Sequence, residues 1–335
     1  MSRYTIRHEH LGAFPVVSLI DSDTGTSVRL ARRGATLLEY QVPVAGRLRD
    51  VDDGYAGADE LDALHGSRFA IMVPFANRIE DARYHFDGSD HDLQPGTPMG
   101  KRGIMHGFVE SADFELLSAD SDDTGASVRL GCHTITADAH PGYPFSLDLE
   151  IAFTLHAGGL DLEAAMRNTG DTTAPCFFGW HPYLRLRDDG VDACELKLPA
   201  RQTIVVDEEL IPLPGADAFK PLDACPELDY RDWRAIGDSV LDNGFCDAAS
   251  DADGRIRSHA RDPDSGLAAT LWQESGVIQV YTSDTLGGDA VRRSVAIEPM
   301  QAMTDAFNRP DCADAITLEP GAERRFRCGL EIHAP

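Results

Sequence analysis

Two ionisable residues of this chain stand in unusually apolar surroundings. His181 lies in the segment 177–184, FFGWHPYL, and Pro182 restricts its backbone to an extended region. A histidine held rigidly among aromatic rings can act as a proton donor with a tuned pKa. Glu298 follows the apolar run 295–297. A carboxylate at the end of a buried strand loses solvation, which raises its pKa toward the range of a general base. Taken singly, a packed core histidine and a solvated strand-end glutamate are equally ordinary interpretations.

Three further polar side chains occur in apolar or turn-rich segments. Arg78 directly follows Asn77, His106 precedes Gly107, and Asp242 precedes an Asn-Gly pair. A guanidinium group can donate several hydrogen bonds to the hydroxyls of a ligand, and a carboxylate can accept them. Glycine beside His106 would let a ligand approach the backbone closely. The ordinary alternatives are a surface arginine, a satisfied core histidine and an Asx-turn carboxylate, because Asn-Gly is a strong turn signal.

Motifs for nucleotide and metal chemistry are missing from the sequence. It contains no G-x-G-x-x-G before a helix, no G-x-x-x-x-G-K-[ST], no G-x-S-x-G and no H-E-x-x-H. His8 and His10 could share a metal ion, but a clear third ligand is lacking. We therefore expect neither a cofactor nor a metal.

The charge and cysteine patterns narrow the partners and the compartment. The 56 acidic and 30 basic residues give a net charge of −26, which repels nucleic acid and anionic membrane surfaces. No stretch approaches the ~18 apolar residues of a membrane span, and the N-terminus has no signal-peptide pattern. The seven cysteines are widely scattered, so we expect reduced, mostly buried thiols. A cytoplasmic protein that binds neither nucleic acid nor membrane is predicted.

The elements that must position these side chains are strands. Apolar residues alternate with polar ones over 147–155, Gly158 and Gly159 follow, and alternation resumes over 160–166, which predicts a β-hairpin with one buried face. Further strands are predicted at 5–6, 26–30, 128–132, 277–281 and 326–332, and the best candidate for a short helix is 58–70. Many short strands separated by turns, without a linker or repeat, predict one all-β domain over residues 1–335, an antiparallel sandwich or barrel.

Seven segments together resemble the aldose 1-epimerase (galactose mutarotase) family in their order. They are PFANRI (74–79), FDG (86–88), MHG (105–107), GYP (142–144), HPY (181–183), QVYT (279–282) and IEP (297–299). The resemblance covers nearly the whole chain. It implies a galactose mutarotase-like fold, a large antiparallel β-sandwich whose concave face holds a sugar.

The resemblance also implies roles for individual residues. Glu298 matches the general base of the family, and His181 matches its general acid. Positions that bind sugar hydroxyls are matched by Arg78, His106, Asp242, Gln279 and Asn77. Two departures occur: Ile71-Met72 stand where many members have Gly-Arg, and His181 is followed by Pro-Tyr-Leu rather than Tyr-Phe-Asn-Leu. These departures concern the preferred sugar more than the reaction.

The implied activity is interconversion of the α and β anomers of a free aldohexose of the galactose or glucose type. The partner is a small-molecule aldose, and the protein is expected to be a monomer or homodimer. Glu298 would be inactivated by protonation at low pH, and His181 by deprotonation at high pH. One alternative is a hexose-6-phosphate 1-epimerase, whose Gly-Gly-Ile-Pro segment is absent from 70–77. Another is a sugar-binding module that does no chemistry.

Overall fold

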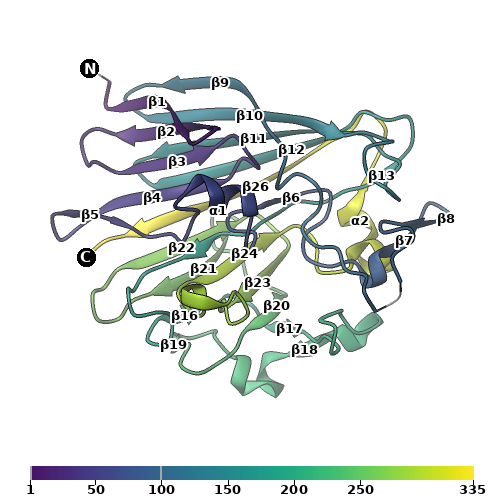
Figure 1. The fold of residues 1–335 in the computed structure, drawn as a ribbon. Helices are drawn as coiled ribbons and strands as arrows, with labels where there is room; N and C mark the ends of the chain where they lie inside the picture. Colours follow the sequence, from purple (N-terminus) through teal and green to yellow (C-terminus); the bar gives the residue numbers. More distant parts are fainter. Residues whose placement is uncertain (1, 99) are drawn as a thin grey trace.

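Antiparallel β-sheets build almost the whole molecule (Figure 1). The computed structural model describes residues 2–98 and 100–335. A five-stranded sheet contains, in order, β1 (Tyr4–Leu11), β2 (Phe14–Asp21), β3 (Ser27–Ala31), β4 (Leu37–Val44) and β5 (Arg47–Asp50). A nine-stranded sheet has the order β19 (Arg234–Ala235), β16 (Glu195–Lys197), β21 (Ile256–Arg261), β22 (Ala268–Gln273), β26 (Glu323–His333), β12 (Gly159–Asn168), β11 (Leu147–His156), β10 (Gly125–Ile135) and β9 (Glu115–Ser121).

A third large sheet supplies much of the candidate site. Its order is β18 (Phe219–Pro221), β17 (Gln202–Ile204), β20 (Asp242–Cys246), β23 (Val277–Tyr281), β24 (Val295–Met300), β14 (Gly179–Trp180) and β6 (Ile71–Met72), with β15 (Tyr183–Leu184) also paired to β24. Two small sheets join β7 (Arg83–Phe86) to β8 (Ser89–Asp92) and β13 (Ala174–Pro175) to β25 (Thr317–Leu318).

Helices are short. The α-helices are α1 (Ala58–Ala63) and α2 (Ala313–Ile316), and the 3-10 turns are η1 (Glu80–Ala82), η2 (Gly215–Ala218), η3 (Leu222–Ala224), η4 (Pro226–Leu228), η5 (Gly288–Ala290), η6 (Ala306–Asn308) and η7 (Pro310–Cys312). Among the described residues, no helix is both long and apolar enough to cross a membrane.

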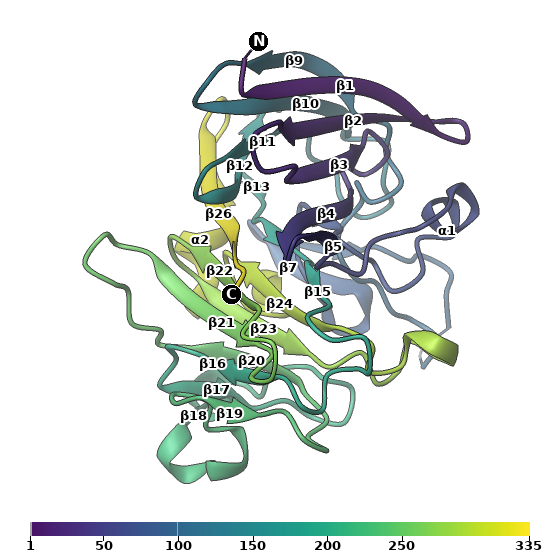
Figure 2. The same cartoon turned by 90° about the vertical axis from the view of Figure 1, so that its left-hand side faces the viewer.

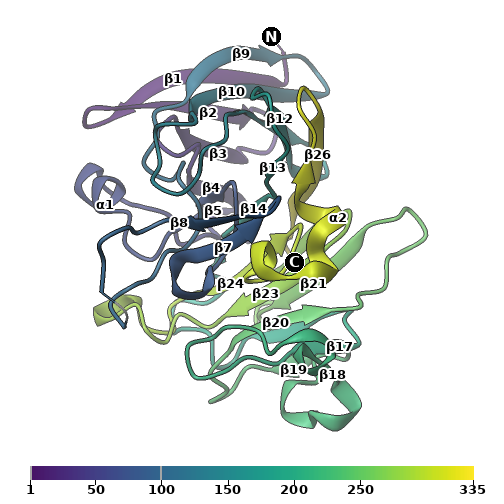
Figure 3. The same cartoon turned by 90° about the vertical axis from the view of Figure 1, so that its right-hand side faces the viewer.

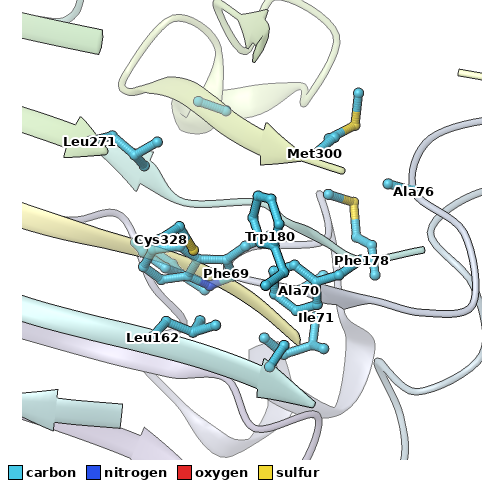
Figure 4. Close-up of a cluster of buried hydrophobic side chains, with 14 of the residues drawn as sticks. Phe69, Ala70, Ile71, Ala76, Leu162, Phe178, Trp180, Leu271, Met300 and Cys328 are labelled. Carbon is cyan, nitrogen blue, oxygen red and sulfur yellow. The ribbon is translucent and has the colours of Figure 1, made fainter. Parts of the chain in front are cut away.

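Packing of the large sheets against one another buries the core. Strand β2 contacts β10 and β11, and β22 contacts β24. In Figure 2 the purple N-terminal strands therefore lie beside β10 and β11, while the green strands form the opposite end of the molecule. Trp180 is fully buried in this core, with its ring centroid 5.9 Å from that of Phe69 and 6.4 Å from that of Phe153 (Figure 4). Burying each such side chain contributes roughly 1.5–3 kcal/mol.

The period-two pattern folds as predicted. Every second side chain of β11 is buried, and β11 pairs with β12 from Leu147↔Asn168 to His156↔Gly159. The hairpin is therefore confirmed, although Gly159 already belongs to β12 and the turn is Ala157-Gly158. The predicted strands at 5–6, 26–30, 128–132, 277–281 and 326–332 coincide with β1, β3, β10, β23 and β26. All seven cysteines are buried and unpaired, as the sequence indicated.

A short helix forms at the start of 58–70, as predicted, and the Asx-turn alternative for Asp242 is wrong. The helix predicted at 58–70 ends at Ala63, because Leu64 takes a left-handed conformation with φ 53°. Beyond this turn the chain extends toward His181, and Phe69 N–H donates to the His181 carbonyl at 2.9 Å. The Asn-Gly pair after Asp242 is not a turn but the interior of β20, since pairing with β17 and β23 on its two sides overrides the local signal.

Candidate active site

Glu298 lies in the middle of a central strand. All six residues of β24 are buried, because β23 covers one edge and the short strands β14 and β15 cover the other. The sequence placed Glu298 at the end of a buried strand, and this was wrong, since the strand continues through Pro299 and Met300. The consequence for the carboxylate is greater burial than a strand end would give, with a side chain only 2% exposed.

His181 lies between the two short strands that pair with β24, β14 and β15, and the register is the same on both sides of it. Gly179 pairs with Met300 and Tyr183 pairs with Ala296, so His181 and Pro182 lie opposite the stretch that contains Glu298. Pro182 and Pro299 lie in the two facing stretches, and neither can donate a hydrogen bond between the strands. On the other side, His181 N–H donates to the Ala70 carbonyl at 3.1 Å. The pairing of β14 and β15 with β24 thus holds the imidazole across from the carboxylate.

The two side chains meet directly. His181 Nε2 is 3.4 Å from Glu298 Oε1. The imidazole stacks on the ring of Tyr183 at 4.7 Å, with 13° between the planes, and meets the ring of His106 edge-on at 5.3 Å. Glu298 Oε2 and His181 Nδ1 are buried and have no hydrogen-bond partner among the described residues.

Burial sets the protonation of this pair. It raises the pKa of Glu298 well above its usual range, the charge of Asp242 raises it further, and Arg78 opposes them. Burial also lowers the pKa of His181 well below its usual range, with His106 adding to the effect. Burial therefore favours the neutral form of each group.

Asn77 and His106 fasten two loops together beside the pair. Each residue has a positive φ, 58° and 63°, and His106 N–H donates to the Asn77 carbonyl at 3.1 Å. Gly107 also has a positive φ, and a Cβ there would lie 2.0 Å from the Val73 carbonyl oxygen. The close neighbour that requires a glycine is thus the protein backbone, not a ligand as the sequence had suggested.

The tautomer of His106 follows from its contacts. Asn77 N–H donates to His106 Nδ1 at 3.3 Å, so Nδ1 is the acceptor and Nε2 carries the hydrogen. Burial, assisted by the charge of Arg78, lowers the pKa of His106 to about 4. His106 is therefore a neutral imidazole that can donate one hydrogen bond through Nε2.

Arg78 and Asp242 lie beside each other and line the same cavity as His181 and Glu298. Asn77 Oδ1 accepts from the Arg78 backbone N–H at 2.9 Å and from Nη1 at 3.0 Å, which directs the guanidinium group. Arg78 Nη2 is 4.0 Å from Asp242 Oδ2. Gln279 Nε2 donates to Asp242 Oδ1 at 2.7 Å, and Gln279 pairs with Glu298 across β23 and β24. Adjacent strands thus present Asp242, Gln279 and Glu298 on one face.

A cavity of about 200 Å³ collects most of the residues that the sequence singled out. His181, Glu298, Arg78, His106, Asp242 and Asn77 line it, whereas Gln279 lies behind Asp242. The sequence missed further lining residues: Gly66, Ser67, Met105, Tyr183, Tyr281, Thr285 and Leu286. Tyr183 and Tyr281 were inside quoted motifs, but only the pairing of their strands reveals that they face the cavity. Met105 belongs to the MHG motif, whereas loops supply Gly66, Ser67, Thr285 and Leu286, which no local pattern marks.

Metal ligation has no support in the geometry of the described residues. Within 2–98 and 100–335, no three His, Cys, Asp or Glu side chains are grouped so that they could hold a metal ion. The cavity instead combines one proton-transfer pair with a neutral donor, a guanidinium group and a carboxylate. Such a set suits an uncharged ligand with several hydroxyl groups.

Comparison with known proteins identifies the family of the chain. The family described as aldose 1-epimerase matches residues 15–331. The chain is 30% identical to the uncharacterised protein YihR of Escherichia coli over 80% of this chain and 79% of that protein. It is 25% identical to the aldose 1-epimerase of the same organism over 90% of each.

Solved structures with the same fold include two with low sequence identity. A Caenorhabditis elegans GalM/aldose epimerase homologue has a TM-score of 0.80 at 20% identity, covering 96% of this chain and 99% of its own. Galactose 1-epimerase from Lactobacillus acidophilus has a TM-score of 0.80 at 15% identity, covering 99% of each. These two show the fold alone, and they confirm the predicted galactose mutarotase-like sandwich. With the sequence match, they establish that the chain belongs to the aldose 1-epimerase family and is an isomerase.

Proposed function

We propose that this member of the aldose 1-epimerase family interconverts the α and β anomers of a free aldohexose, with Glu298 and His181 as the proton-transfer pair. The observation that carries the proposal is the direct approach of His181 Nε2 to Glu298 Oε1 at 3.4 Å inside a cavity lined by hydrogen-bonding groups. Ring opening of a hemiacetal needs one proton removed from O1 and one delivered to O5, and two positioned groups supply both transfers.

In the proposed cycle the closed sugar meets ionised Glu298 and protonated His181. Glu298 takes the proton from the C1 hydroxyl as His181 protonates O5, and the C1–O5 bond breaks. The resulting aldehyde faces neutral Glu298 and neutral His181, which are the forms that burial favours in this cavity. Rotation about C1–C2 and closure on the other face return both protons and yield the opposite anomer. Burial thus stabilises the protonation state of the open-chain intermediate.

The remaining residues orient the sugar. Arg78 and the Nε2–H of His106 donate to hydroxyl oxygens, and Asp242 accepts from hydroxyl hydrogens, while Gln279 holds the Asp242 carboxylate at 2.7 Å. Fixed orientation of this kind lowers the entropy cost of reaching the transition state. None of these contacts requires a metal or cofactor.

The pH dependence of kcat should be bell-shaped, because activity is lost when the pair gains or loses a proton. The active pair carries one proton. At low pH the pair gains a second proton and at high pH it loses its only one, and burial favours the neutral form of each group by lowering the pKa of His181 and raising that of Glu298. Ring-nitrogen NMR of His181 should therefore report a neutral imidazole at neutral pH, and infrared spectra should show a protonated carboxyl that Glu298→Gln removes. A charged imidazole with an ionised Glu298 in the free enzyme would reverse the assignment.

A phosphorylated substrate fits the surroundings poorly. A cleft of about 680 Å³ adjoins the sugar cavity and shares Arg78 and Met105 with it. The other charged groups lining this cleft are Glu80, Asp81, Arg102, Asp207 and Glu209. The Arg102 side chain is 2% exposed and is bound by Asp92 at 2.7 Å, so it is already neutralised. Carboxylates would repel a phosphate group, which favours a free sugar over a hexose 6-phosphate.

Polarimetry tests the proposal. Freshly dissolved α-galactose and α-glucose should reach anomeric equilibrium faster with the enzyme than without it, and glucose 6-phosphate should respond less. Faster equilibration of the phosphate would favour the hexose-6-phosphate epimerase. Tight galactose binding without any acceleration would leave a sugar-binding module that does no chemistry. The oligomeric state, monomer or homodimer, stays a prediction.

A further inference from the structure

The loop that follows β24 holds the segment that carries Arg78. Asp305 N–H donates to the Arg78 carbonyl at 2.9 Å, and Asp305 Oδ1 accepts from Glu80 N–H at 2.9 Å. These two hydrogen bonds grip the backbone on the C-terminal side of Arg78, through its own carbonyl and the amide two residues later. Asp305 lies five residues after Met300, the end of the strand that contains Glu298. Through its two hydrogen bonds, Asp305 therefore links the loop after this strand to the segment that contains Arg78.

The grip of Asp305 is buried and reinforced. Asp305 is 5% exposed. Asn308 Nδ2 donates both to Asp305 Oδ1 at 2.7 Å and to the Arg83 carbonyl at 2.9 Å, which ties η6 to β7. Figure 3 shows this yellow C-terminal loop lying against the blue β7. A hydrogen bond in a buried setting is electrostatically stronger than one exposed to water.

The start of the same loop is fixed as well. Gln301 N–H donates to the Phe178 carbonyl at 2.8 Å, and Gln301 Oε1 accepts from Phe178 N–H at 3.1 Å. The loop is therefore anchored beside β14, next to the chain that bears His181. Asp305 itself is not among the residues that line the sugar cavity. Any effect on the sugar must act through Arg78.

We propose that Asp305 is a positioning residue, which holds the Arg78 backbone so that the guanidinium group stays between Asn77 Oδ1 and Asp242. The inference rests on the proposed function, since Arg78 is taken there as a donor to sugar hydroxyls. The role belongs to the hydrogen-bond acceptor at Oδ1, which asparagine also possesses, and not to the negative charge as such.

Two substitutions of Asp305 separate the loss of its hydrogen bonds from an effect of backbone strain. Asp305 has φ 60°, a conformation that glycine adopts freely and asparagine tolerates. Asp305→Gly removes the carboxylate without adding strain and should raise the KM for galactose about tenfold with kcat little changed. Asp305→Asn keeps an acceptor for both Glu80 N–H and Asn308 Nδ2, and should restore KM to near the wild-type value.

A double-mutant cycle with Arg78→Ala tests whether Asp305 acts on the sugar through the Arg78 side chain. Once the Arg78 side chain is gone, Asp305→Gly should change kcat/KM little further, because nothing is left to position. Asp311→Asn is the matched control: Asp311 lies in the same loop and pairs with Arg309 at 2.8 Å, away from the Arg78 segment. It should leave KM unchanged.

Several outcomes would overturn the role of Asp305: an unchanged KM in Asp305→Gly, an Asp305→Asn variant as impaired as the glycine variant, or fully additive effects with Arg78→Ala. If Asp305→Gly fails to fold, Asn308→Ala should still raise KM by a smaller factor, and an unchanged KM there would count against the inference. Wild-type protein that does not accelerate mutarotation would contradict the proposed function itself, which is seen before any variant is made.

Discussion

Glu298→Gln should lower kcat for galactose mutarotation by about 10²–10⁴-fold, while KM stays near its wild-type value. Glutamine has the shape of a neutral glutamic acid and keeps hydrogen-bonding capacity toward the sugar, but it cannot take or return a proton. Because the loss falls on the transition state rather than on binding, polarimetric kcat and KM measured separately should reveal it. A rise in KM with an unchanged kcat would show that Glu298 binds sugar without transferring protons.

The same substitution should not destabilise the fold. The pKa of Glu298 is raised by burial in the folded state, so ionisation of the unfolded chain favours unfolding, and stability falls as pH rises from the ordinary glutamate range toward the raised pKa. Glutamine does not ionise and removes this cost at neutral pH. Thermal unfolding should therefore give a Tm at least equal to that of the wild type. Asp52→Asn is the matched control, since Asp52 is also buried with a raised pKa and does not line the cavity; its activity should be retained.

His181→Asn should lower kcat by a similar factor of about 10²–10⁴. The amide fits the space of the imidazole approximately but cannot shuttle a proton to O5 at any useful pH. Since the two residues act as one proton-transfer unit, the double variant Glu298→Gln/His181→Asn should be little slower than either single variant. Polarimetry at high enzyme concentration measures all three.

His140 supplies the control for the His181 substitution. Its ring stacks on Phe108 at 4.1 Å, and burial lowers its pKa as it does for His181, but it does not line the cavity. His140→Asn should keep the wild-type kcat. In the double variant Glu298→Gln/His181→Asn, losses of kcat that multiply would contradict the action of the two residues as a unit.

Much of the site could be predicted from the resemblance of seven ordered motifs to the aldose 1-epimerase family, because residue types alone left an ordinary alternative open at each position. His181, Glu298, Arg78, His106, Asp242 and Asn77 were all identified before their positions in space were known, and they line a common cavity. Gln279 was also identified, but sequence could not show that it lies behind Asp242, because that placement depends on which strand pairs with β23.

Tertiary pairing decided the electrostatics of the reacting pair. From the sequence, Glu298 was a strand-end carboxylate and His181 a proton donor with an adjusted pKa. The three strands that flank β24 bury both groups, and this burial raises the pKa of Glu298 and lowers that of His181. Desolvation is a property of the whole assembled core, and no short segment contains it.

By itself the sequence determined the class of fold, because alternation with a period of two acts locally and forces one face of each strand inward. It also determined the chemical groups available, through residue type. Only the tertiary structure decided that Asn243-Gly244 belongs to a strand rather than a turn, that Glu298 lies in mid-strand, and that Asp305 holds the Arg78 segment. Each of these depends on contacts between residues far apart in the chain, where pairing and burial outweigh local preference.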